Sequence, residues 1–165
     1  MTIISDPKLT AGLAVRFDNV SIVFGDHPDR ALPLMYQGQT RGEIQQTTAQ
    51  VLGVHNCSLD VAEGEILVLM GLSGSGKSTL IRCLSRLIEP TLGNIVINGD
   101  DVTTMNDEQL RTLRRNKVSM VFQRFGLFSH RRVLDNIAYG LEVQGVNRAD
   151  RRTRARVPGE AADHR

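Results

Sequence analysis

A glycine-rich stretch in the middle of the chain, GLSGSGKST at Gly71–Thr79, constrains the fold more than any other feature. The five apolar residues of Ile66–Met70 precede it, and an unbroken apolar run of this length predicts a strand covered on both faces, as in a parallel α/β sheet. After the loop, apolar residues recur at helical spacing, at Leu80, Ile81, Leu84 and Leu87. The order strand, glycine loop, helix predicts an α/β fold.

The loop also predicts a chemistry, because it fills the phosphate-binding pattern GxxxxGK[ST] in the context that this pattern requires. Glycines allow backbone angles and a close approach that a Cβ atom would block, so that successive N–H groups can point at phosphate oxygens. Lys77 can reach the β- and γ-phosphates of a nucleotide, and Ser78 offers a hydroxyl to Mg²⁺. The predicted binding residues are Gly71, Ser73, Gly74, Ser75, Gly76, Lys77, Ser78 and Thr79.

The remaining sequence narrows the class of protein. At 165 residues with 41% hydrophobic and 4% aromatic residues, the composition fits a single domain of the soluble α/β type. No apolar run before the loop is long enough to cross a bilayer, and the N-terminus shows no secretory leader, so a cytoplasmic protein is expected. NKVS at Asn116–Ser119 lacks the aspartate that reads guanine, which disfavours a GTPase. Cys57 and Cys83 stand apart and are interpreted as small buried hydrophobes.

Hydrophobic periodicity gives a coarse map of the other elements. Leu13–Phe24 predicts one or two half-buried strands and Cys57–Val61 another, which suits an antiparallel sheet. Between them, residues 25–54 begin with prolines and predict a helix around Arg41–Leu52. Further along, we expect a strand at 94–99, a helix capped by Asn106 or Asp107 and ending at Arg115, a strand at 117–123, and an amphipathic helix at 133–143.

Two long stretches carry a resemblance to a known family. VSMVFQRFGLFSHRRVLDNIAYGLEVQGV is similar to the Q-loop and following helical region of ABC-transporter ATPase subunits, and GEILVLMGLSGSGKSTLIRCLSRLIEPTLGNIVINGDDV resembles their phosphate-loop segment. The insertion at 25–54, entered through FGDHPDRALPLMYQGQ and followed by LGVHNCSLDVAEGEI, resembles the subunits that power uptake of quaternary amines: glycine betaine, choline and proline betaine.

The resemblance implies the N-terminal part of an ABC-type P-loop ATPase domain, with an antiparallel β subdomain and an incomplete parallel core. It further implies binding of ATP and Mg²⁺, and ATP hydrolysis coupled to import. The implied partners are a membrane-spanning permease subunit, a second ATPase copy and, indirectly, a substrate-binding protein. The subunit would then be peripheral on the inner face of the cell membrane.

Several residues match family positions. Gln123 matches the Q-loop glutamine, which in the family meets Mg²⁺ and the attacking water and senses the membrane subunit. Phe24 falls where the family has an adenine-stacking aromatic, although a core phenylalanine would leave the same pattern. Phe125, Leu127 and Phe128 resemble the groove that receives a coupling helix of the permease, with inward packing as the alternative.

The chain also departs from the family. The resemblance is expected to end near Arg154, and the sequence contains no LSGGQ-type signature, no Walker B motif and no switch histidine. We therefore expect a partial ATP-binding domain at 1–147 and a tail at 148–165 that is disordered or out of frame, in a C-terminally truncated chain that does not turn over ATP alone.

Two other functions stay open: a non-catalytic ATP-binding fragment, and a soluble ABC-type protein acting on nucleic acid or ribosomes. The tail holds 6 basic and 3 acidic residues, but it has no aromatic residue to stack on a base. Nucleic acid is therefore not expected as a partner.

Overall fold

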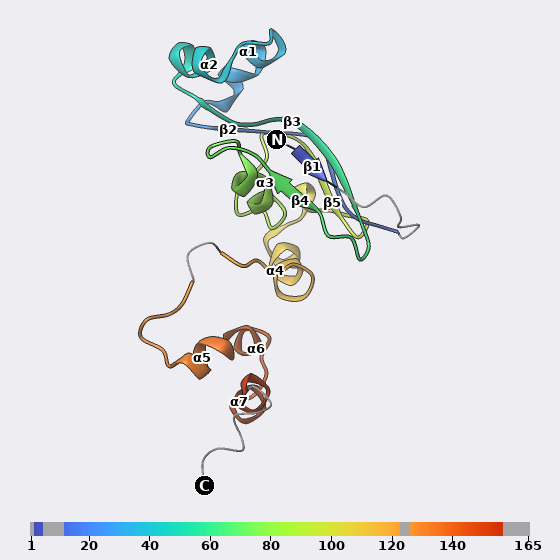
Figure 1. Ribbon diagram of the computed structural model, residues 1–165, viewed down its shortest axis with the longest axis vertical. Helices are drawn as coiled ribbons and strands as arrows, with labels where there is room; N and C mark the ends of the chain where they lie inside the picture. Colours follow the sequence, from blue (N-terminus) through green and yellow to red (C-terminus); the bar gives the residue numbers. More distant parts are fainter. Residues whose placement is uncertain (1, 5–11, 123–125, 157–165) are drawn as a thin grey trace. The chain divides into compact units, whose positions relative to one another are not determined.

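The structure is a computed structural model that describes residues 2–4, 12–122 and 126–156. The chain divides into two compact units, Met1–Leu113 and Arg114–Arg165. Each is described by itself, and Figure 1 shows their elements.

An antiparallel sheet forms the larger part of the first unit, in the order β3-β2-β5-β6. Its strands are β2 (Leu13–Phe24), β3 (Val51–Ala62), β5 (Leu92–Ile97) and β6 (Asp100–Asp101). The central strand β2 pairs with both long neighbours, so that Phe17 lies opposite Leu59 on one side and Ile95 on the other. The predicted antiparallel strands are confirmed, and 13–24 forms one strand rather than two.

The register of β2 shifts between Phe17 and Val20, where Asn19 adopts a positive φ of 51° and its N–H donates to Ser58 Oγ (2.9 Å). After this irregularity four consecutive residues of β2 are buried, at Val20, Ser21, Ile22 and Val23. Because side chains alternate along a strand, four consecutive buried residues mean that β2 is covered on both faces after the shift.

The segment between β2 and β3, residues 25–50, is called the inserted segment below. It contains η1 (Pro28–Ala31), α1 (Leu32–Tyr36) and α2 (Arg41–Thr48), which lie at one end of β2 and β3 (Figure 1). The predicted helix around Arg41 is confirmed, but Ala49 adopts φ 59° and ends it, so Val51–Val54 belong to β3. A small core joins the segment to the sheet through Val23, Ala31, Met35, Ile44 and Leu52.

The run before the glycine loop differs from the sequence-based expectation. Only Val68–Met70 forms a strand, β4, and it pairs antiparallel with β1 (Thr2–Ile4). Ile66 is 84% exposed, so the prediction of a strand covered on both faces is wrong. A buried strand needs partners on both edges, and β1 is the one strand paired with β4 among the described residues.

The helix after the loop, α3, spans Lys77–Cys83 and buries Leu80 and Cys83. It then closes in a Schellman turn: Leu87 N donates to Arg82 O (3.1 Å) and Arg86 N to Cys83 O (2.9 Å), with Arg86 at φ 45°. The predicted helix therefore exists, and the turn accounts for its end before Leu87.

The cap predicted for the next helix is confirmed. In α4 (Asp107–Asn116), preceded by the short η2 (Val102–Thr104), Asn106 Oδ1 accepts from Gln109 N (3.0 Å). In return, Gln109 Oε1 accepts from Asn106 N (2.9 Å). Leu110 and Leu113 form the buried face of α4.

In the second unit, the predicted strand at 117–123 does not form over the described part of that range, and Val121 is 98% exposed. Alternation within a short run does not by itself supply the neighbouring strand that pairing requires. The predicted helix at 133–143 is divided at Ala138 into α5 (Val133–Ile137) and α6 (Tyr139–Val143).

The basic tail at 148–165, expected to be disordered or out of frame, begins as a helix, α7 (Arg148–Ala155). Asn147 caps it by accepting from Asp150 N (3.0 Å). Arg152 pairs with Asp135 (3.0 Å) and Arg151 with Glu142 (3.3 Å), which ties α7 to α5 and α6. Residues 157–165 lie outside the described part.

Candidate functional site

The glycine loop connects β4 to α3 and is shaped by its contact with β3. Gly76 adopts φ 92°, and a Cβ atom there would lie 2.5 Å from Gly53 O and 3.0 Å from Val54 Cγ2. Glycine is therefore required at this position for two reasons: the positive φ, and the close approach of β3. Gly74 also has a positive φ, of 78°, but open space around it.

Lys77 folds back across this loop. Its Nζ donates to Gly71 O (2.7 Å), Leu72 O (2.7 Å) and Ser75 Oγ (3.0 Å). The ammonium is thus enclosed by neutral oxygens of the loop itself. A phosphate oxygen carries more negative charge than these acceptors, so a bound phosphate could replace some of them.

The other predicted loop residues lie in or beside the first turn of α3. Ser78 is exposed and Thr79 is half-buried, while Leu80 N makes the first described bond of the helix, to Gly76 O (2.9 Å). N–H groups before that bond have no acceptor within the helix. The structure therefore brings the predicted residues from Gly71 to Thr79 together as one loop and helix start.

Sequence reasoning missed one residue that contacts the loop. Arg41, at the start of α2, donates through Nη1 to Gly74 O and through Nη2 to Gly53 O, each at 3.0 Å. The helix start at Thr40–Glu43 is readable from the sequence, but nothing in a single sequence indicates contacts to residues so far along the chain. A pocket of about 430 Å³ lies beside this contact, lined by Arg41, Ser75 and residues 54–58 of β3.

Phe24 lies near the same loop. It ends β2 opposite Val51 and is 39% exposed, so it is not a fully buried core residue. A Cβ atom at Gly53 would lie 2.7 Å from Phe24 Cε2, so the ring covers Gly53, whose carbonyl in turn faces Gly76. Adenine stacking stays a prediction for this ring.

The donor set around the loop fits Mg²⁺ only together with a nucleotide. Among the described residues there is no group of three His, Cys, Asp or Glu side chains that could hold a metal ion. Ser78 would thus share the ion with phosphate oxygens, as in other P-loop sites. Gln123, the other predicted ligand, lies outside the described residues.

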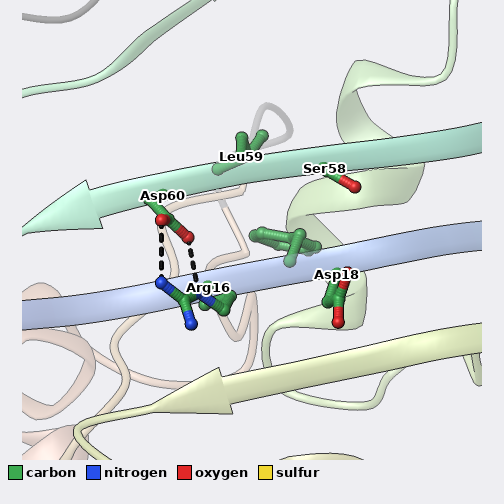
Figure 2. Close-up of a pocket in the computed structure, with 6 residues that line it drawn as sticks. Arg16, Asp18, Ser58, Leu59 and Asp60 are labelled. Atoms are coloured by element: carbon green, nitrogen blue, oxygen red, sulfur yellow. Dashed lines mark hydrogen bonds and ion pairs between the residues drawn. The ribbon is translucent and has the colours of Figure 1, made fainter.

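A second pocket, of about 380 Å³, lies on the sheet between β2 and β3 (Figure 2). There Arg16 pairs with Asp60 through two bonds, Nε to Oδ1 (2.9 Å) and Nη2 to Oδ2 (3.0 Å). The hydrogen bond from Arg16 holds the pKa of Asp60 below its usual range. The two charges satisfy each other, which fits a cross-strand ion pair on the sheet surface.

Of the two cysteines interpreted as small buried hydrophobes, Cys83 is buried and Cys57 is half-buried. Burial raises the pKa of the Cys83 thiol to about 12 and also raises that of Cys57. Neither thiol is therefore ionised near neutral pH, as a nucleophile would need to be.

The predicted docking groove has two of its three apolar residues in the described part. Leu127 is 69% exposed. The Phe128 ring instead packs edge-on against the Tyr139 ring, with 4.6 Å between the ring centroids, and Arg131 Cζ lies 5.1 Å from the Phe128 centroid. Phe125 lies outside the described residues.

Among the helices of the described residues, none is long and apolar enough for a bilayer crossing.

Comparisons with known proteins identify the family. The sequence model of the family described as ABC transporter matches residues 54–164, and thus runs past Arg154, where the resemblance was expected to end. The chain is 50% identical over 143 residues to the glycine betaine transport ATP-binding protein OpuAA of Bacillus subtilis. It is 48% identical over 143 residues to the glycine betaine/proline betaine transport system ATP-binding protein ProV of Escherichia coli.

These matches cover 87% of this chain but 34% of OpuAA and 36% of ProV, so the chain spans about a third of the length of these relatives. The fold is similar to a dimeric, post-hydrolysis structure of the ATP-binding cassette MJ0796 bound to ADP and Pi. That similarity has a TM-score of 0.64 at 28% identity and covers 86% of this chain and 53% of the cassette. The family match over most of the chain, the cassette-like fold and the glycine loop agree, and the chain belongs to the ABC transporter family.

Proposed function

We propose that the chain binds Mg-ATP through Gly71–Thr79. The observation that carries this proposal is the packing of the loop on β3, where Gly76 meets Gly53 and leaves Lys77 enclosed by loop oxygens. Bound phosphates would attract the Lys77 ammonium, and Ser78 would hold Mg²⁺ against the same phosphates. The ADP and Pi in the MJ0796 cassette structure support a nucleotide as the ligand class.

Titration of the purified chain with a fluorescent ATP analogue tests this proposal. Lys77→Ala should remove most of the binding, because it removes the ammonium that lies against Gly71 O, Leu72 O and Ser75 Oγ within the loop and would meet the phosphates. Arg82→Ala is the matched control, since it removes a cation from an exposed position on the same helix. Equal affinities of the wild type and Lys77→Ala would refute the assignment.

The relatives favour a role in the import of quaternary amines. Their names include transport of glycine betaine, proline betaine and carnitine, at 44% to 50% identity. We place this chain in the ATP-binding subunit of such an importer, on the inner face of the membrane. There it would contact a permease subunit and a second ATPase copy, and a substrate-binding protein indirectly.

A second substrate is favoured by one specific observation. The chain is 50% identical over 137 residues to the trimethylamine N-oxide transport system ATP-binding protein TmoW of Ruegeria pomeroyi. Both kinds of substrate carry a fully substituted cationic nitrogen. Uptake of labelled glycine betaine and labelled trimethylamine N-oxide should be compared in cells that hold the assembled transporter, with Lys77→Ala as the inactive reference. Import of neither compound would contradict the proposed substrate class.

Hydrolysis by the family requires more than the phosphate loop. A positioned water and compensation of the developing charge come from Walker B residues, a switch histidine and the signature of a partner, and this sequence contains none of these. Gln123 remains the candidate for contact with Mg²⁺ and the attacking water. We therefore propose that the chain of 165 residues alone holds ATP without turning it over.

A further inference from the structure

The inserted segment reaches the phosphate loop through one guanidinium group. Arg41 donates to Gly74 O in the loop and to Gly53 O in β3, both at 3.0 Å. The same Gly53 carbonyl faces Gly76, where loop and strand are closest. Arg41 therefore bridges the loop and β3 at their contact.

The start of α2 fixes the backbone of Arg41. Arg41 is the first residue of α2, within the capping box of Thr40 and Glu43: Thr40 N donates to Glu43 Oε2 (2.7 Å) and Glu43 N to Thr40 Oγ1 (3.4 Å). The hydrogen bonds from Thr40 keep the pKa of Glu43 below its usual value. One turn later Ile44 is fully buried and anchors α2 on the small core of the inserted segment.

The bond to Gly74 O has a consequence for the loop. A carbonyl and the following N–H lie in one rigid peptide plane, so fixing Gly74 O also fixes the direction of Ser75 N–H. That N–H closes a turn with Leu72 O (3.2 Å), and Lys77 Nζ contacts Leu72 O and Ser75 Oγ within the same turn. Gly74 has a positive φ, and nothing lies within 4 Å of the position that a Cβ atom would take there, so no packing on that side constrains the peptide and the bond from Arg41 to Gly74 O does.

We propose that Arg41 is a positioning residue for nucleotide binding: it holds the turn Leu72–Ser75 in the shape that receives phosphates, and so links the inserted segment to the affinity of the loop. This inference rests on the proposed function, the binding of ATP by Gly71–Thr79. The planar fork of a guanidinium can reach two carbonyls at once, whereas the ammonium of a lysine is a single point of charge. Shape, and not charge alone, is therefore required.

The test compares four variants of the full chain in titrations with the fluorescent ATP analogue: Arg41→Ala, Arg41→Lys, Arg30→Ala and Lys77→Ala. We expect Arg41→Ala and Arg41→Lys to weaken binding about tenfold, the size of effect expected for a charge-assisted hydrogen bond. Arg30→Ala should bind like the wild type, because Arg30 is an exposed cation of the same segment. Far-UV circular dichroism establishes that each variant is folded.

A second measurement is independent of the ligand. In the nucleotide-free chain, Arg41→Ala and Arg41→Lys should both speed hydrogen exchange of the Ser75 amide, whereas Arg30→Ala should leave it unchanged. Unchanged exchange in the Arg41 variants would overturn the positioning role. Full affinity in Arg41→Lys would also overturn it, by showing that charge suffices.

The failure of this inference and that of the proposed function can be told apart. If Arg41→Ala binds like the wild type while Lys77→Ala does not bind, the positioning role is wrong and the nucleotide site stands. If Lys77→Ala binds like the wild type, the nucleotide site itself is wrong.

Discussion

At the scale of single residues, the site depends on a backbone contact between Gly76 and Gly53. A Cβ atom at Gly76 would lie 2.5 Å from Gly53 O, and the residues on either side of Gly53, Leu52 and Val54, pair with β2. The oxygen belongs to backbone and cannot rotate away as a side chain would. The geometry of the loop is thus fixed by the sheet beneath it.

Gly76→Ala should destabilise the first unit by about 2 kcal/mol or more, because the strain of a positive φ adds to the clash with Gly53 O. Urea unfolding measures this change in the free energy of unfolding. Gly64→Ala is the matched control, since Gly64 also has a positive φ, of 74°, but nothing within 4 Å of a new Cβ atom. Its expected cost is about 1 kcal/mol. Equal losses in the two variants would show that the contact with β3 contributes nothing.

The sequence predicted the loop residues because their chemistry is local: the glycines, Lys77 and Ser78 stand in one consecutive pattern. It did not predict Arg41, whose two acceptors lie 33 and 12 residues away along the chain. The sequence also did not decide whether Phe24 stacks on adenine or packs in the core, because both roles favour an aromatic residue. Its half-exposed place over Gly53 depends on the register of β2 with β3.

At the scale of helices and strands, the hydrophobic pattern predicted whether a segment is a helix or a strand better than it predicted whether that segment is buried. The antiparallel strands and the α4 cap were predicted correctly, because alternating hydrophobicity and capping residues are signals contained within a few neighbouring positions. The run at 66–70 was assigned to a buried strand and that at 117–123 to a strand, although burial and pairing depend on neighbours that a local pattern does not contain. The tail at 148–165 was expected to be disordered or out of frame, yet its first residues form α7, which Asn147 caps and two ion pairs hold.

The ion pair of α7 with Asp135 should depend on pH. The hydrogen bond from Arg152 lowers the pKa of Asp135 from its ordinary 3.8. The contribution of the pair is therefore complete above that ordinary value and is lost as the pH falls through the lowered one. Asp135→Asn should speed hydrogen exchange of the α7 amides at about pH 7 and have a smaller effect at about pH 2, where Asp135 takes up protons.

The control for this prediction is Arg154→Gln, which removes an exposed charge from α7 without touching Asp135. It should leave exchange in α7 close to that of the wild type at both pH values. An effect of Asp135→Asn that is as large at about pH 2 as at about pH 7 would show that the side chain acts by packing and not by charge.

At the scale of the whole molecule, large apolar side chains are exposed around the phosphate loop. Ile66 and Leu72 are 84% and 85% exposed, and Val68 and Met70 are about half exposed. Exposed apolar groups gathered in one place mark surfaces that other protein covers. In a chain that spans about a third of its curated relatives, this surface fits the partial cassette expected from the sequence.

The same partial character leads to a prediction about catalysis. Phosphate release by the chain alone should stay near background, because each missing catalytic role commonly costs about 10² to 10³ in rate. The measurement uses purified chain with Mg-ATP and takes Lys77→Ala as the reference for contaminating activity. Steady turnover that disappears in Lys77→Ala would show that the residues present suffice for hydrolysis.

The central claim is that nucleotide phosphates bind at Gly71–Thr79, and amide chemical shifts of the isotope-labelled chain test it most directly. Addition of Mg-ATP should shift the amide resonances of Gly74, Gly76, Lys77 and Ser78 most strongly, because their N–H groups would face phosphate oxygens. Adenosine, which has no phosphates, should leave these four resonances in place. Shifts of equal size with adenosine, or Mg-ATP shifts confined to residues outside the loop, would contradict the claim.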